Sequence, residues 1–413
     1  MIGFSSARAI PAVLSIVFVG VLVRSLGVSN YAYFSLAAAV ANTCASICAG
    51  WIAQGALRYL PGRPDRAESA APALSVAVVL AALATVSTCV GGLAALLPDG
   101  VRGQLMLAIC VLAAAMMYQS VWLARVMITG RSSLYAGSEI IRCAVVLGLA
   151  LTLNVSGHLG LASAAWTFAG SYIAAVAFLH VFERLGISFK SRMGGSRAKA
   201  VRRAWLLRLW RFGSPMSLWL GLAVSLPLID RAILLGRLGS EEAGTYAASY
   251  DIFFRIAALL FGPVLMVLHP QIMREVNTGR TDVARKWVHR SLAVALVVSP
   301  LVSLGVASAA PPVARLLGIS VGGITFRLAF LITLGGCMWQ TAFIAHKFLE
   351  MQHRTRLLLL CMISAIAVHA VLLLYLSAWA GLAGAAGAAI LSGAMYCLLT
   401  LVFGYVRDSR VLT

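Results

Sequence analysis

The chain has 413 residues, of which 61% are hydrophobic and only 11% are charged. Soluble globular proteins carry roughly 25% charged residues, so this composition excludes an ordinary soluble protein. The formal net charge of +20 invites a nucleic-acid interpretation, but the distribution of the basic residues along the chain argues against one.

Apolar runs long enough to cross a bilayer recur along the whole sequence, and they predict an all-α integral membrane protein with about twelve transmembrane helices. The first run starts near the N-terminus and lacks a signal-peptide cleavage pattern, so we expect it to remain as helix 1. The predicted spans cover residues 7–26, 31–58, 70–97, 102–124, 134–156, 159–182, 212–236, 243–270, 291–311, 321–346, 357–379 and 381–404.

The basic residues are distributed very unequally between the two sets of loops. Of the 33 Lys and Arg residues, 25 fall in loops on the side of the N-terminus, four on the opposite side and four within spans. Cytoplasmic loops carry such an excess of Lys and Arg, so both termini are predicted to be cytoplasmic. We expect the basic loops to contact anionic lipid headgroups, and no nucleic acid.

Two stretches about 212 residues apart resemble each other, and each follows a long apolar run. They are Leu26-Gly27-Val28-Ser29-Asn30-Tyr31-Ala32-Tyr33-Phe34 and Leu238-Gly239-Ser240-Glu241-Glu242-Ala243-Gly244-Thr245-Tyr246. The similarity continues in Gly130-Arg131 with His353-Arg354, and in Gly160-Leu161-Ala162 with Gly381-Leu382-Ala383. We therefore expect a parallel internal repeat of two six-helix bundles, residues 1–182 and 212–413, joined by a basic cytoplasmic linker over 183–211.

Ionisable residues inside the spans are the candidates for function, because each costs about 2.5–3.5 kcal/mol at the bilayer centre. Two pairs share a helix face by their spacing: Glu139 with Arg142, and Asp251 with Arg255. Asp230 and Arg231 are adjacent and should meet different neighbours. We expect Arg142, Arg231, Arg255 and Arg327 to bind substrate, since arginine suits phosphate, and Asp230, Glu139 or Asp251 to take up a coupling ion.

Other interpretations of these ionisable residues stay open. Ion pairs can merely orient helices, and Glu139, Arg142 and Arg327 lie close enough to a span end to reach the membrane surface. His369, in the middle of a span, is either a buried packing residue or a further proton carrier. Arg255 lies deep enough to favour a water-filled cavity.

The sequence contains no nucleotide-binding phosphate loop, and the predicted outer loops are too short to hold catalytic groups. We therefore expect neither an enzyme nor a catalytic residue, and no cofactor or metal. A membrane glycosyltransferase or polymerase, the alternative from another functional class, would need a large outer loop. A purely structural role is a further alternative.

Several short motifs resemble those of the polysaccharide-transport proteins, the oligosaccharide-lipid flippases of the multidrug/oligosaccharidyl-lipid/polysaccharide exporter superfamily. The first-half turn Val23-Arg24-Ser25-Leu26-Gly27 is similar to the opening of that family. The second half resembles it more closely, in Phe212-Gly213-Ser214-Pro215, Ile229-Asp230-Arg231, Leu238-Gly239, Gly244-Thr245-Tyr246 and Pro270-Gln271-Ile272. Ala32 departs from the pattern, since that family often has Gly there, whereas Gly244 keeps it.

The resemblance implies a flippase that moves an undecaprenyl-diphosphate-linked oligosaccharide across the bacterial inner membrane by alternating access, for exopolysaccharide, capsule or O-antigen synthesis. It implies cationic residues around a central cavity, and a polysaccharide polymerase and glycosyltransferases as partners. A cation-coupled multidrug exporter of the same superfamily is the main alternative. Its cargo is typically cationic, so it should prefer acidic residues, and the four arginines within spans argue against it.

Overall fold

The computed structural model describes residues 2–60, 64–184, 196–316 and 325–405. Within these ranges the chain is helical and has no strand. The helices, in chain order, are α1 (Ile2–Tyr59), α2 (Pro64–Leu96), α3 (Asp99–Ile128), α4 (Ser132–Val155), α5 (Leu161–Arg184), α6 (Ser196–Leu238), α7 (Ser240–Ser249), the π-helical turn η1 (Tyr250–Phe254), α8 (Arg255–Asn277), α9 (Thr281–Leu316), α10 (Phe326–Ala345), α11 (Lys347–Met351) and α12 (Thr355–Tyr405).

Ten helical segments in the described chain are long and apolar enough to cross a membrane. Two of them, α1 and α12, consist of two arms joined by non-helical residues, Gly27 in α1 and Ala380-Gly381 in α12. Because each arm has the length of a span, these ten segments are compatible with the twelve spans that the hydropathy predicts. The prediction of an all-α, multi-pass membrane protein is confirmed.

The second part of the predicted basic linker over 183–211 is helical. The basic segment before residue 212 is helical from Ser196 onward and continues without interruption into the following span as α6. Between residues 196 and 212 the sequence is rich in Arg, Ala and Leu, which are good helix formers, and lacks Gly and Pro. Residues 185–195 of the predicted linker lie outside the described residues, and the predicted division into domains at 183–211 stays a prediction.

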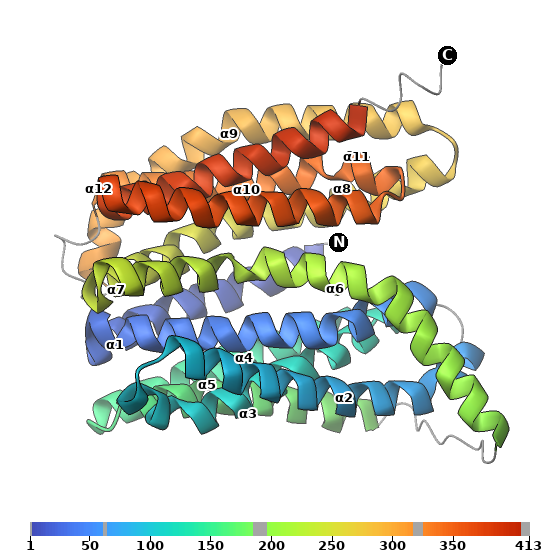
Figure 1. Cartoon of the computed structure of the whole chain (residues 1–413), viewed down its shortest axis with the longest axis horizontal. Coiled ribbons are helices and arrows are strands. Elements are labelled where there is room, and N and C mark those ends of the chain that lie inside the picture. Colours follow the sequence, from blue (N-terminus) through green and yellow to red (C-terminus); the bar gives the residue numbers. More distant parts are fainter. Residues whose placement is uncertain (1, 61–63, 185–195, 317–324, 406–413) are drawn as a thin grey trace. The chain divides into compact units, whose positions relative to one another are not determined.

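The chain forms two compact units. Unit 1 comprises residues 1–18 and 33–228, and unit 2 comprises residues 19–32 and 229–413. In unit 1, α3 packs against α2, α4 and α5. In unit 2, α10 packs between α8, α9 and α12, which run beside it in Figure 1. In the Phe326–Met351 span, which contains α10, 67% of the most apolar 18-residue stretch is buried, more than in any other candidate span, so α10 is the central helix of unit 2.

The internal repeat is visible in the backbone at two pairs of turns. Gly27 has φ 75° and ψ 159°, and the equivalent Gly239 has φ 86° and ψ 177°, a conformation that is essentially restricted to glycine. Gly130 and its equivalent His353 also share a positive φ, of 70° and 55°. The residue after each of them donates its amide N–H to the carbonyl five residues back, at 3.1 and 3.0 Å. The two halves therefore make the same turns at these two pairs of positions, whereas the third matched pair differs, because Gly381 has a φ of 56° and Gly160 has no positive φ.

Small residues allow close backbone contacts inside unit 2. A Cβ added at Gly244 would lie 1.8 Å from the carbonyl oxygen of Val28, and one at Gly384 would lie 1.9 Å from that of Leu376. Helices in a membrane gain from such close approach because no hydrophobic force drives their association. Gly244, which stands where the first half has Ala32, thus has a packing role.

Candidate functional site

The carboxylate of Asp251 is the centre of a buried polar cluster in unit 2. Its Oδ2 accepts hydrogen bonds from the Tyr31 hydroxyl and from Arg231 Nη2, both at 2.7 Å. Its Oδ1 accepts a bond from Arg255 Nη2 at 3.2 Å. Three separate elements supply these donors: α1 just after its non-helical glycine, the end of α6, and the start of α8. The cluster therefore depends on the tertiary fold of unit 2.

Asp251 lies in the π-helical turn η1, the single departure from α geometry between α7 and α8. A π-turn accommodates one extra residue in a helix, and such turns occur frequently at functional sites. The rings of Tyr250 and Phe254 stack across it with centroids 4.3 Å apart. The Asp251 carboxylate and the Arg255 guanidinium therefore come from one continuous helical segment that contains this turn.

The two arginines differ in exposure. The Arg231 side chain is 7% exposed, like that of Asp251, whereas the Arg255 side chain is 50% exposed. Arg255 lies 15 residues from one end of the Ser240–Val276 span, about 22 Å at roughly 1.5 Å per residue. Two guanidinium groups share one carboxylate, so the cluster has a net positive charge at that depth. Because half of the Arg255 side chain is exposed, the positive charge of the cluster is accessible at this residue.

A second buried cluster in unit 2 surrounds Asp230, and it includes His369. His369 Nε2 lies 2.7 Å from Asp230 Oδ1, and its Nδ1 lies 3.0 Å from Ser392 Oγ. The Tyr246 hydroxyl donates to Asp230 Oδ2 at 3.3 Å. Adjacent Asp230 and Arg231 thus meet different partners, as their separation of about 100° predicts.

The imidazole of His369 has a polar partner at each nitrogen, Ser392 Oγ at Nδ1 and Asp230 Oδ1 at Nε2. The Ser392 hydroxyl also lies 3.2 Å from the carbonyl oxygen of Ala389, to which it can donate. A 2.7 Å contact between an imidazole nitrogen and a carboxyl oxygen needs one proton between them. Both His369 and Asp230 are fully buried.

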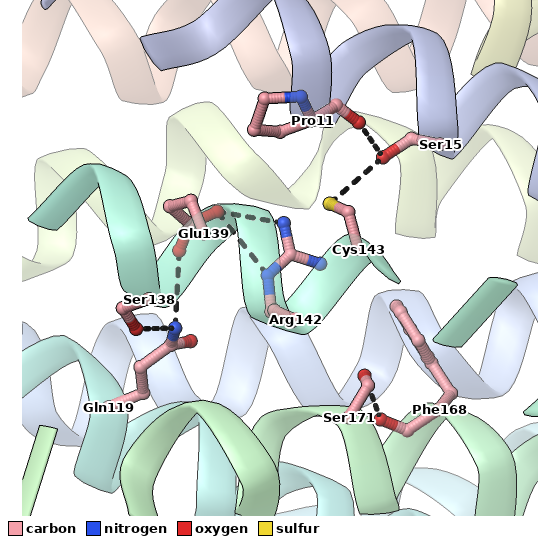
Figure 2. A network of polar contacts seen from close by, with 9 residues as sticks. All are labelled: Pro11, Ser15, Gln119, Ser138, Glu139, Arg142, Cys143, Phe168 and Ser171. Carbon is pink, nitrogen blue, oxygen red and sulfur yellow. Dashed lines mark hydrogen bonds and ion pairs between the residues drawn. The ribbon is translucent and has the colours of Figure 1, made fainter. Parts of the chain in front are cut away.

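Unit 1 contains a third cluster, shown in Figure 2, around Glu139 and Arg142 of α4. Arg142 Nη2 donates to Glu139 at 2.8 Å, and Gln119 donates to the other carboxylate oxygen at 3.1 Å. The guanidinium also lies 5.0 Å from the centroid of the Tyr172 ring. The predicted pairs of Glu139 with Arg142 and Asp251 with Arg255 are thus both formed. Their proposed roles in binding and coupling stay predictions.

Among the described residues, no ion pair joins Arg327 to these clusters. Arg327 is an exposed residue in the first turn of α10, where an arginine can extend to a membrane surface. Within the described residues, no group of His, Cys, Asp and Glu has an arrangement that would hold a metal ion.

Three partners in the two clusters of unit 2 were not assigned a site role from the sequence, and neither were Gln119 and Tyr172 in unit 1. Tyr31 and Tyr246 belong to the repeated motif, and their place in that motif was the available signal: Tyr31 contacts Asp251, and Tyr246 contacts Asp230. No feature of the sequence singled out Ser392.

Comparison with known proteins identifies the fold. No protein-family model matches the sequence, and no curated protein matches it. A solved inward-facing multidrug resistance MATE family transporter of the MOP superfamily is 14% identical, with a TM-score of 0.75 over 98% of both chains. A mutant of the Vibrio cholerae MATE transporter VcmN is 15% identical, with a TM-score of 0.62 over 100% of this chain and 99% of that one. A MOP superfamily transporter from Pyrococcus furiosus is 13% identical, with a TM-score of 0.64 over 100% and 95%.

The chain is therefore a multi-pass membrane protein with the fold of the MATE transporters. These structural neighbours are transporters and not enzymes.

Proposed function

We propose that this protein is an alternating-access transporter that flips an undecaprenyl-diphosphate-linked oligosaccharide across the bacterial inner membrane. The observation that carries the proposal is the excess positive charge at Asp251, where Arg231 and Arg255 share one carboxylate. The cargo would serve exopolysaccharide, capsule or O-antigen synthesis. A polysaccharide polymerase and glycosyltransferases are the proposed partners.

Arg255 has the chemistry that a diphosphate headgroup needs. Its hydrogen bond to Asp251 uses one nitrogen of the guanidinium, and half of the side chain is exposed. The planar guanidinium carries five N–H donors in a fork that matches two phosphate oxygens. Arg231 has the opposite role in this proposal, because its buried guanidinium holds Asp251 in place.

A cation-coupled multidrug exporter is the second candidate, favoured by the description of a structural neighbour as a multidrug resistance transporter. The Pyrococcus furiosus neighbour is described as a MOP superfamily transporter whose reversed pocket polarity suggests a different function. That description supports the view that charge in the site, more than the fold, decides the cargo. The positive charge at Arg255 favours an anionic cargo over a cationic drug.

We propose Asp230 with His369 as the coupling site among the three candidate acids. Asp251 is matched by two arginines, and Glu139 is matched by Arg142. Asp230 instead faces an imidazole, a side chain that commonly relays protons.

The cargo is tested by translocation in reconstituted vesicles. A polyprenyl-diphosphate oligosaccharide is supplied on one face, and the native chain is compared with Arg255→Ala and Arg255→Lys. Loss of one or two charge-assisted hydrogen bonds, about 1.5–3 kcal/mol each, lowers the rate by roughly tenfold or more in Arg255→Ala. Arg255→Lys keeps the charge without the fork and gives an intermediate rate. The matched control is Arg280→Ala, which removes another exposed, ion-paired arginine of unit 2.

Two results would contradict the cargo assignment. Equal rates in Arg255→Ala and Arg280→Ala would remove Arg255 from the site. Transport of a monovalent organic cation by folded native protein, without any flipping of the diphosphate lipid, would favour the exporter.

The coupling site is tested by comparing Asp230→Asn with Glu139→Gln and Asp251→Asn under an imposed proton gradient. We expect Asp230→Asn to abolish gradient-driven accumulation while cargo exchange without a gradient persists. If Glu139→Gln alone has this effect, coupling belongs to unit 1 and the assignment is wrong.

A further inference from the structure

Two arginines at one end of unit 1, Arg58 at the end of α1 and Arg208 in α6, form a cluster that the proposed transport does not use. The Arg58 guanidinium lies 5.2 Å from the ring centroid of Phe212. The Arg208 guanidinium lies 5.9 Å from the ring of Tyr59 and 5.3 Å from that of Trp205. Tyr59 and Phe212 pack edge to face at 5.8 Å, which links the two arginines through their aromatic partners.

The fold holds this cluster rigidly. Trp205 is buried together with Ala56, Leu60, Ala70 and Ala73, so the α6 segment is fixed against the end of α1 and the start of α2. Leu209, one turn further along α6, is fully buried in a neighbouring apolar cluster. The arginines therefore project from a packed surface and not from a free helix.

Both guanidinium groups keep donors available for an anion. Arg58 and Arg208 are exposed, and among the side chains that the structure describes neither forms an ion pair with a carboxylate. Contact with an aromatic ring occupies a face of the planar guanidinium and leaves the N–H groups at its edge free to donate. The two forks border the same pair of aromatic rings, and the arginine fork suits phosphate oxygens.

The α6 segment that carries Arg208 also exposes large hydrophobic residues, which favours a lipid as the source of the anion. Leu207 is 49% exposed and Trp210 is 53% exposed. Tryptophan is enriched where a membrane protein meets the lipid headgroups, and apolar side chains there contact acyl chains. A helix of this kind suits the surface of a membrane better than it suits a soluble phosphate.

We propose that Arg58 and Arg208, with Tyr59, Phe212 and Trp205, form a binding site for the phosphate headgroup of an anionic membrane phospholipid. The predicted topology places this end of α1 at the cytoplasmic leaflet. The site belongs to unit 1, whereas Asp251 and Asp230 belong to unit 2, so the proposal does not depend on the identity of the cargo.

The test is native mass spectrometry of the detergent-purified full chain titrated with phosphatidylglycerol. Phosphatidylethanolamine with the same acyl chains is the comparison lipid. The variant is Arg58→Gln/Arg208→Gln, and the matched control is Arg202→Gln/Arg203→Gln, which removes the same charge from exposed positions of α6. We expect phosphatidylglycerol to bind the native chain and the control similarly. Binding to the variant should be at least about tenfold weaker, in keeping with the loss of charge-assisted hydrogen bonds.

Several outcomes would overturn the site. Equal weakening in both double variants would mean that the basic helix attracts lipid only through its total charge. Equal binding of the two lipids would remove the anion requirement. Binding of a short polyprenyl diphosphate in place of phosphatidylglycerol would assign the arginines to the cargo. Size-exclusion profiles of the native chain and both variants must agree, and Arg58→Lys/Arg208→Lys serves as a second variant if the first fails to fold.

Discussion

Replacement of Asp251 by asparagine is the most direct test of the buried charge cluster. The substitution changes one oxygen to an amide nitrogen and preserves the size of the side chain. The remaining amide oxygen would still accept a hydrogen bond from Tyr31. The substitution removes the negative charge that Arg231 and Arg255 share, so any effect reports on charge and not on a cavity.

The expected magnitude follows from the geometry. At the 2.7 Å separation of Arg231 and Asp251, Coulomb attraction is about 6 kcal/mol with an effective dielectric constant of about 20. Desolvation of both groups offsets much of this attraction in the native chain. After the substitution, Arg231 remains buried with its desolvation cost but without its counter-charge. Breaking such a pair typically destabilises a protein by about 3–5 kcal/mol.

The assay is thermal unfolding in detergent, followed by the fraction of protein that remains monodisperse after heating. We expect Asp251→Asn to lower the midpoint by about 3–6 °C, because the unfolding entropy of a 413-residue chain is large. Asp99→Asn is the control, because Asp99 pairs with Arg102 in an exposed position, with 89% of its side chain exposed. Adding Arg231→Met to Asp251→Asn should recover at least half of the loss.

Two results would refute this reasoning. One is an equal shift for Asp251→Asn and Asp99→Asn, which would mean that the buried pair contributes no more than a surface pair. The other is a further loss in the double variant, which would mean that Arg231 stabilises unit 2 by packing and not through Asp251.

Three predictions concern the backbone, and each is measured by the same unfolding assay. His353→Gly should raise stability by about 1 kcal/mol, because only the non-glycine residue is strained at φ 55°; an unchanged midpoint would show that the turn tolerates histidine. Gly27→Ala should lower the free energy of unfolding by about 1–3 kcal/mol, because a φ of 75° with a ψ of 159° strains any residue other than glycine. The added Cβ would meet no atom within 4 Å, so the effect would come from the backbone alone. An unchanged midpoint would mean that the chain adopts another turn. Gly244→Ala should cost more than Gly236→Ala, since only the former collides with the Val28 carbonyl, and equal costs would contradict that contact.

Much of the fold was predictable because it depends on local patterns. Twelve apolar runs predict twelve crossings, and the i, i+3 and i, i+4 spacings predict the contacts of Glu139 with Arg142 and of Asp251 with Arg255. The repeat predicts equivalent turns at Gly27 and Gly239. Each of these features is set by residues that lie close together in the sequence.

The site was less predictable because its contacts join distant segments. Arg231 reaches Asp251 across 20 positions, and His369 reaches Asp230 across 139. Helix packing decides such contacts, and hydropathy does not encode which helices pack together. The sequence left His369 open between packing and proton transfer, and only its position against Asp230 singles it out.

The π-helical turn at Tyr250–Phe254 has a consequence for how this site can change. An extra residue in a helix rotates everything that follows by about 100° relative to everything before it. Deleting one residue there would swing Arg255 away from the Asp251 side of the helix while leaving the span long enough to cross the bilayer. A single-codon insertion or deletion at this turn is thus a simple route by which relatives of this chain can gain or lose a cationic site.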